Sequence, residues 1–248
     1  MSRLRVEKRW RPKVRIGAPD RSLTGVSGMV AVSELCEQLD VVGALDKAVG
    51  PVKQRARGHS AGQLLVGLAA AQLAGEDHLV GLDRHRADAA GQVLTPVPGL
   101  CSTTAGGLAQ RITEEQWRRV EAGVAVVSAR MLARLPAARR TALLQRATID
   151  LDTTDVEVYG RCKQGVAYNY QGQRCGRPHV ASWAEIGVTL VAELLAGNED
   201  PRPGAAGLLR RALAALPPGI SRSAWRSLPG NWSAWTARTT DTPAVRST

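Results

Sequence analysis

The hydrophobic pattern of this chain changes its period at Ala147. Before residue 147 apolar side chains recur at helical spacing, whereas after it short runs alternate apolar and polar residues. A period near 3.6 predicts helices and a period of two predicts strands. The sequence therefore predicts an α+β protein in which a helical part comes first and a sheet follows.

Several helix boundaries can be predicted before residue 147. Ser60, Ser102 and Thr113 are typical N-cap residues, and Thr113 with Gln116 three positions later has the pattern of a capping box. Pro136 is expected to end the helix that begins after Thr113. The helices expected here run from Met29 onwards and over residues 61–74, 79–86, 114–135 and 137–146.

After residue 147 the pattern predicts strands and one more helix. The strands are expected over residues 147–152, 156–159, 180–184 and 187–195. Residues 161–178 are polar and rich in glycine, which predicts a loop or a wide hairpin. An amphipathic helix is expected over 203–216, ended by Pro217 and Pro218. Trp117 and Trp183 are predicted to lie in the core.

Two acids lie two residues apart in the first of these strands, Asp150 and Asp152. Because side chains alternate along a strand, both carboxylates are expected on one face and Leu151 on the other, towards a core. Two neighbouring carboxylates repel each other unless a cation or a proton lies between them. This pair is therefore the candidate chemical centre of the chain.

Three interpretations fit the pair by itself. In a two-metal site for phosphoryl transfer, such carboxylates hold Mg²⁺, which prefers oxygen ligands. In a phosphatase of the haloacid-dehalogenase type, Asp150 would be the nucleophile and Asp152 the acid–base. That site also needs a pair of acids further on, and no Asp-Asp or Asp-x-x-x-Asp follows. In the third interpretation the acids only end a strand and cap a turn with Thr153, Thr154 and Asp155.

The positive charge is concentrated at the two ends of the chain. Of the net charge of +11, residues 1–15 contribute +6 and residues 221–248 contribute +3. A dense group of cations binds polyanions through counterion release, although a solvated terminus without a partner fits the same charge. Residues 1–20 are predicted to form a mobile basic arm. The candidate DNA-binding residues are Arg3, Arg5, Lys8, Arg9, Arg11, Lys13 and Arg15.

Other parts of the sequence exclude several classes of protein. The four cysteines form no Cys-x-x-Cys pair, so neither a zinc site nor a disulfide framework is predicted. No apolar run approaches the roughly 18 residues that span a bilayer, and the N-terminus has no secretory signal. A cytoplasmic protein without a membrane partner is expected. Residues 221–248 contain ten Ser or Thr and are expected to be disordered.

The ordered series of motifs resembles the DDE transposases of bacterial insertion sequences, in particular the family called IS thirteen-eighty. The resemblance covers about residues 10–220. Its motifs are Gly58-His59-Ser60, Ile149-Asp-Leu-Asp-Thr-Thr154, Tyr159-Gly160, Lys163-Gln-Gly165, Tyr168-Asn-Tyr170 and Leu194-Leu-Ala-Gly-Asn198.

The resemblance implies a fold and a reaction. Residues 21–146 would be a helical region that contacts DNA, and residues 147–220 would belong to an RNase H-like catalytic core. The reaction would be Mg²⁺-dependent attack by water, and then by a 3′-hydroxyl, on DNA at the ends of the element. The first metal-binding aspartate falls on Asp152, with Asp150 as a secondary ligand. The implied partners are DNA with terminal inverted repeats and either a second copy or a full-length transposase.

The sequence also departs from this family. The family needs a second aspartate on a fourth strand and a glutamate on a later helix. Here the core is expected to be incomplete, with three strands and a helix, and Asp241 has no apolar strand before it. The change in composition at residue 221 is what a frameshift produces. The chain is therefore predicted to be truncated before the second catalytic aspartate and inactive alone.

Two alternatives remain at this point. The chain could be a non-catalytic DNA-binding fragment that regulates transposition, or the product of a decayed gene that does not fold stably.

Overall fold

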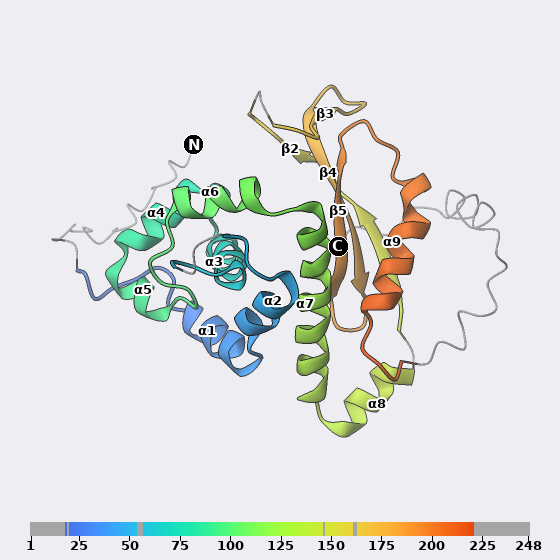
Figure 1. The fold of residues 1–248 in the computed structure, drawn as a ribbon, viewed down its shortest axis with the longest axis horizontal. Helices are drawn as coiled ribbons and strands as arrows, with labels where there is room; N and C mark the ends of the chain where they lie inside the picture. Colours follow the sequence, from blue (N-terminus) through green and yellow to red (C-terminus); the bar gives the residue numbers. More distant parts are fainter. Residues whose placement is uncertain (1–17, 19, 54–56, 146, 161–162, 221–248) are drawn as a thin grey trace, which may run out of the picture.

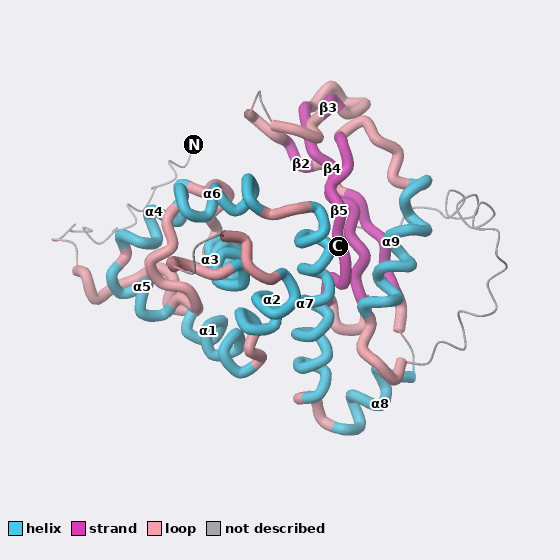
Figure 2. Tube along the Cα trace, in the orientation of Figure 1, coloured by secondary structure: helices cyan, strands magenta, loops and turns pink. Residues whose placement is uncertain are grey.

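The computed structural model describes residues 18, 20–53, 57–145, 147–160 and 163–220. The basic residues expected to bind DNA, from Arg3 to Arg15, lie outside the described residues, as does the tail expected over 221–248. In the described part, helices come first and an antiparallel sheet follows, so the prediction of an α+β protein is confirmed (Figure 2).

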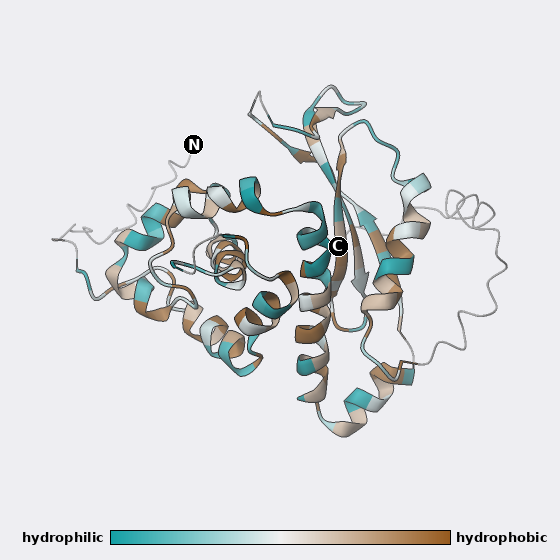
Figure 3. Cartoon of the chain, in the orientation of Figure 1, coloured by the Kyte–Doolittle hydropathy of each residue, from teal (hydrophilic) through white to brown (hydrophobic). Residues whose placement is uncertain are grey.

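Eight helices precede the sheet in the part of the chain that is described. α3 contacts α2, α4 and α6 and is mostly hydrophobic (Figure 3). α7 stands between the other helices and the sheet (Figure 1). The eight helices are α1 (Met29–Gln38), α2 (Val41–Val49), α3 (Ala61–Leu73), α4 (Val80–Ala87), α5 (Ala89–Leu94), α6 (Ser102–Arg111), α7 (Glu114–Ala133) and α8 (Ala137–Gln145).

The predicted caps of α3 and α7 are confirmed. The Ser60 hydroxyl accepts a hydrogen bond from the Gln63 backbone N–H at 3.2 Å, and the Gln63 side chain accepts one from the Ser60 N–H at 2.9 Å. Thr113 and Gln116 form the same reciprocal pair at the start of α7. These two capping boxes satisfy backbone donors that the first turn of a helix leaves unpaired.

The cap predicted at Ser102 was wrong. Ser102 is not an N-cap: Cys101 occupies that position of α6, and the Ser102 backbone N–H donates to the Asp83 carboxylate of α4 at 3.1 Å. The helical pattern expected from Met29 onwards is confirmed, and it is divided into two helices because Asp40 adopts a left-handed conformation with φ of 46° between α1 and α2. The Arg130 guanidinium of α7 donates to the Asp40 carbonyl at 2.8 Å and fixes this break.

Five strands form one sheet around β4 in the described residues. They are β1 (Ile149–Thr153), β2 (Val156–Glu157), β3 (Ala167–Tyr168), β4 (Arg174–Trp183) and β5 (Val188–Ala196), followed by helix α9 (Arg202–Ala215). β1 and β2 pair with β4 in one antiparallel register, from Ile149 opposite Trp183 to Glu157 opposite Cys175. β5 and β3 pair antiparallel with β4 as well.

The loop or wide hairpin expected over residues 161–178 is confirmed as a hairpin of β3 and the start of β4, but its second strand does not end at Pro178, because β4 runs from Arg174 to Trp183. Proline cannot donate to a strand ladder. Pro178 is tolerated because it lies opposite the gap between β1 and β2, where its carbonyl accepts a hydrogen bond from the Thr154 N–H at 3.2 Å. The described core has five strands and a helix rather than three strands and a helix: β2 lies within the strand expected over residues 156–159, and β3 was not predicted.

Two hydrophobic cores hold the molecule together. The first lies among the helices, around the fully buried Leu64. The second joins the sheet to α7, α8 and α9, with Trp183 and Leu208 fully buried and Leu132 of α7 among them. The prediction that Trp183 lies in the core is confirmed. For Trp117 it is wrong, since 45% of that residue is exposed.

No described helix has the length and apolar character needed to cross a lipid bilayer.

Candidate functional site

Asp150 and Asp152 lie on the same face of β1, as the alternation of side chains predicts. Both are exposed, whereas Ile149 and Leu151 point the other way and pack against the second core, which contains α9. Two residues along a strand correspond to about 7 Å. The strand therefore presents two carboxylates to solvent on the face of the sheet that α9 does not cover.

The carboxylates of Asp150 and Asp152 have few partners. The Thr154 hydroxyl donates to Asp152 Oδ2 at 3.1 Å, and across the ladder on β4 lie Ser182, opposite Asp150, and Val180, opposite Asp152. Neither acid takes part in an ion pair with any described residue. Both sets of carboxylate oxygens therefore face solvent, which suits the hard oxygen ligation that Mg²⁺ prefers.

The other acids near the sheet are already bound by neighbouring groups. Glu185 accepts hydrogen bonds from the Thr148 backbone N–H at 3.0 and 3.1 Å and from its hydroxyl at 2.7 Å. Asp155 pairs with Arg177, and Glu193 pairs with Arg211. Asp150 and Asp152 thus differ from their neighbours, although no group of three potential metal ligands occurs among the described residues.

Asp155 is the centre of a polar cluster that the sequence did not predict. The Arg177 Nε donates to Asp155 Oδ1 at 2.6 Å, and the Asn169 amide donates to Oδ2 at 2.9 Å. The hydrogen bond from Arg177 lowers the pKa of Asp155, and the bond from Asn169 adds to this effect. Asn169 is buried, and its carbonyl oxygen accepts from the backbone N–H groups of Gln171 and Gln173. Through Asp155, the cluster attaches the turn that follows β3 to Arg177 of β4.

The Asp155 cluster predicts a pH dependence. Because the pKa of Asp155 is lower in the folded chain than in the unfolded chain, its contribution to stability is complete above the unfolded pKa and is lost as the pH falls through the folded pKa. The unfolding free energies of the wild type and of Asp155→Asn are therefore expected to differ at pH 7 and to converge below about pH 4. Urea denaturation at a series of pH values measures both. A difference that stays constant down to the acid limit would contradict this assignment.

A second cluster links the sheet to two helices. Arg211 of α9 donates to Glu121 of α7 at 2.5 Å and to Glu193 of β5 at 2.7 Å. The hydrogen bond to Glu121 raises the pKa of Arg211. The Nδ1 atom of the buried His179 lies 3.3 Å from a Glu193 oxygen. Glu121 is 90 positions from Arg211 in the sequence and Glu193 is 18 positions from it, so only the fold brings the three residues together.

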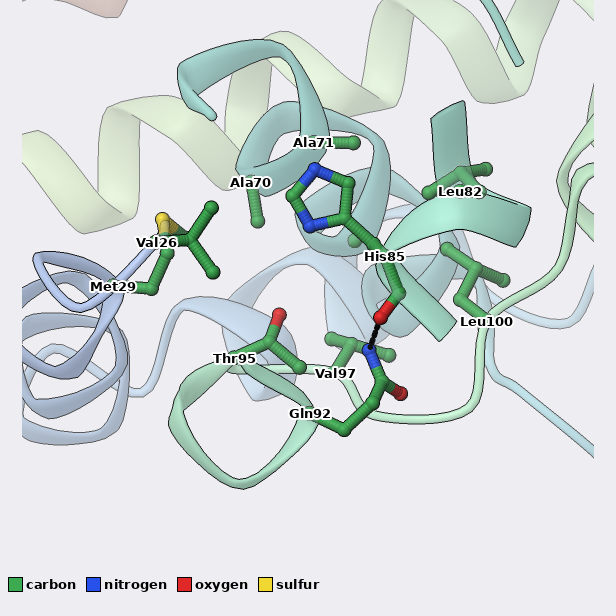
Figure 4. A pocket seen from close by; sticks show the side chains of 11 residues that line it. Val26, Met29, Ala70, Ala71, Leu82, His85, Gln92, Thr95, Val97 and Leu100 are labelled. Carbon is green, nitrogen blue, oxygen red and sulfur yellow. Dashed lines mark hydrogen bonds between the residues drawn. The ribbon is translucent and has the colours of Figure 1, made fainter. Parts of the chain in front are cut away.

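The cavities show where a ligand has room. A small cavity among α1, α3, α4 and α5 has a volume of only about 20 Å³ and is lined largely by apolar side chains (Figure 4). The Gln92 amide beside it donates to the His85 carbonyl at 2.9 Å. The cavity holds at most a water molecule. Two open hollows are larger. One, of about 570 Å³, lies between α2 and α3, and the other, of about 760 Å³, lies beside β2 and β3.

The comparisons with known proteins give one match. The family model described as Transposase DDE domain group 1 matches residues 6–225. No curated protein and no solved structure matches the chain significantly.

Proposed function

The chain belongs to the family Transposase DDE domain group 1, and from this premise we propose that it acts in DNA transposition with Asp152 as a metal ligand and Asp150 as a secondary ligand. The observation that carries the proposal is the pair of exposed carboxylates on one face of β1, without ion pairs among the described residues. The family acts on DNA and generally uses a divalent metal ion.

The residues of β1 fit Mg²⁺ in part. When bound, Mg²⁺ would help to activate the attacking hydroxyl and to stabilise the leaving oxygen of a DNA phosphodiester. Asp152 supplies carboxylate oxygens for the ion, and the Thr154 hydroxyl orients this carboxylate through its 3.1 Å hydrogen bond. Asp150 adds negative charge on the same face. Mg²⁺ requires six oxygen ligands, so water and further groups must complete its shell.

We further propose that residues 147–220 are an incomplete RNase H-like core of the IS thirteen-eighty type, which holds the first catalytic aspartate and not the second. In the described residues β1 pairs with β4 along one edge only, and its other edge keeps unpaired backbone donors and acceptors. Such an edge accepts another strand. Without the missing acids the chain is inactive alone, and a full-length transposase bound to it would supply them, whereas a second copy would contribute only its own Asp152.

The helical region, residues 21–146, is proposed to contact DNA together with the basic arm of residues 1–20. The hollow between α2 and α3 supports this, because the cationic side chains of Lys53 and Arg57 line it. Cationic side chains of this kind bind phosphates without reading the base sequence. The proposed DNA carries the terminal inverted repeats of an insertion sequence. The alternative function, a non-catalytic regulator of transposition, uses this same surface and needs no carboxylates.

A complementation experiment tests the role of Asp152. The chain is mixed with a full-length member of the family that is inactivated at its own first catalytic aspartate, and Mg²⁺-dependent cleavage of element-end DNA is measured. Cleavage is expected only in the mixture. The variant Asp152→Asn is expected to reduce it roughly 100-fold or more, because a metal ligand is lost. Asp200→Asn is the matched control, since Asp200 pairs with Arg202 away from β1.

Three outcomes discriminate between the proposals. Mg²⁺-dependent nicking by the purified chain alone, lost in Asp152→Ala, would show that the core is complete. If the mixture cleaves DNA equally well with the Asp152→Asn variant, Asp152 is not a ligand of the metal ion. DNA binding that depends on salt, is unaffected by Asp152→Ala and supports no cleavage would favour the regulator.

A further inference from the structure

All three tyrosines of the chain lie exposed on one ribbon of the sheet. We use "tyrosine ribbon" for residues 156–160 and 163–174, which contain β2, β3 and the turn before β4 (Figure 1). The exposed fractions are 83% for Tyr159, 67% for Tyr168 and 88% for Tyr170. Aromatic side chains are usually buried to a large extent, so three exposed rings on one ribbon point to a binding surface.

Two of these rings, those of Tyr159 and Tyr168, line the open hollow beside β2 and β3. Tyr159 follows β2 and Tyr168 belongs to β3, so the rings come from two separate segments of the ribbon. The hollow is open to solvent and has a volume of about 760 Å³, which leaves room for a flat ring between the two tyrosines. The Tyr159 hydroxyl donates to Glu157 Oε2 at 2.9 Å, and this bond holds its ring in place.

The charges around the hollow favour a nucleobase over a phosphate. The carboxylate of Glu157 and the guanidinium of Arg174 both line it, so their charges offset each other, and a phosphate would meet a carboxylate. A nucleobase offers a flat face for stacking on tyrosine. Its amino groups can donate to carboxylate and amide oxygens, and Glu157 and Gln173 provide these.

The tyrosine ribbon is held at a fixed place relative to Asp152. The buried Asn169 joins the turn after Tyr168 to Asp155, and Asp155 is bound in turn by Arg177 of β4. β2 pairs with the same edge of β4 as β1 does, directly after the end of β1. Five residues separate Asp152 from Glu157, which corresponds to about 17 Å of strand, or the length of about five stacked base pairs.

From these contacts we infer that the hollow of the tyrosine ribbon binds one unpaired nucleobase of the DNA on which the chain acts. This inference rests on the proposed function and adds to it a site for unpaired DNA near the metal-binding strand. The base stacks on Tyr168 or between Tyr168 and Tyr159, and Glu157 and Gln173 accept hydrogen bonds from its amino group.

Fluorescence with two DNA probes tests the inference on the full chain. One probe is a duplex with a short single-stranded overhang that contains 2-aminopurine, and the other is the same duplex fully paired. Binding of the overhang is expected to quench the 2-aminopurine. In Tyr168→Ala the quenching is lost and the Kd for the overhang probe rises on the order of tenfold, while the Kd for the paired duplex is unchanged.

Two matched variants control for the loss of side-chain volume. Tyr168→Phe keeps the ring and is expected to bind the overhang as the wild type does. Tyr170→Ala removes an exposed ring that does not line the hollow, and it is expected to keep both the affinity and the quenching. Since Tyr168 is exposed, its replacement leaves the core packing intact.

The possible results separate the inference from the proposed function. If Tyr168→Ala binds the overhang as tightly as the wild type, or weakens both probes equally, the nucleobase site is wrong and the proposed function stands. If the wild type binds neither probe at any salt concentration, both are wrong.

Discussion

Replacing Trp183 by alanine is expected to lower the free energy of unfolding by about 3–5 kcal/mol. Trp183 is fully buried at the end of β4, opposite Ile149 of β1 and Val188 of β5. It lies in the second core with Leu208 of α9. Alanine would leave a cavity between three strands and a helix, and rigid strands close such a cavity only in part. Urea denaturation followed by far-ultraviolet circular dichroism measures the change without relying on tryptophan fluorescence.

Trp117 provides a matched control for this experiment. It lies on α7 with 45% of its surface exposed, outside both cores. Trp117→Ala is expected to change the unfolding free energy by about 0.5 kcal/mol or less. Equal losses in the two variants would mean that the second core is not packed around Trp183 as described.

Replacing Gly197 by alanine is expected to cost about 3 kcal/mol of stability. Gly197 is buried directly after β5, and a Cβ atom there would lie 2.5 Å from both the Ala167 carbonyl oxygen and the Cys175 sulfur. It would also lie 2.7 Å from the Cys175 carbonyl oxygen. Two of these contacts are backbone atoms of β3 and β4, so relief requires the strands to move apart. Thermal unfolding and urea denaturation of the variant measure the effect.

Gly207 on α9 is the control for Gly197. Nothing lies within 4 Å of a Cβ atom at Gly207, and the residue is helical. Alanine has a higher helix propensity than glycine, so Gly207→Ala is expected to stabilise the chain by up to about 1 kcal/mol. The two substitutions are chemically identical and have opposite expected signs. Destabilisation by Gly207→Ala, or no effect of Gly197→Ala, would contradict the packing around these glycines.

Features that depend on a few neighbouring residues could be predicted from the sequence. The N-cap at Ser60 and the capping box at Thr113 need only partners within three positions, and both are confirmed. The shared face of Asp150 and Asp152 follows from the period of a strand alone. Their roles as metal ligands stay predictions, because a role depends on groups that the period does not specify.

Features that depend on distant residues could not be predicted in the same way. Arg177 binds Asp155 across 22 positions, and neither residue carries a local pattern that indicates the other. Pro178 was interpreted as the end of a loop, since a proline usually marks one, but its place opposite a gap in the neighbouring strand is a property of the sheet. Exposure of Trp117 likewise depends on which face of α7 meets each core.

The position of α7 affects how this architecture can be divided or recombined. Val120 and Val124 of α7 pack against the first core, and Leu132 of the same helix belongs to the second. One continuous helix therefore contributes side chains to both cores. Leu143 of α8 also belongs to the second core. A gene segment that begins at residue 147 would carry the strands without the helical residues that cover them. The smallest exchangeable unit that keeps the sheet covered therefore begins before α7, and the helical part and the sheet are expected to be inherited together.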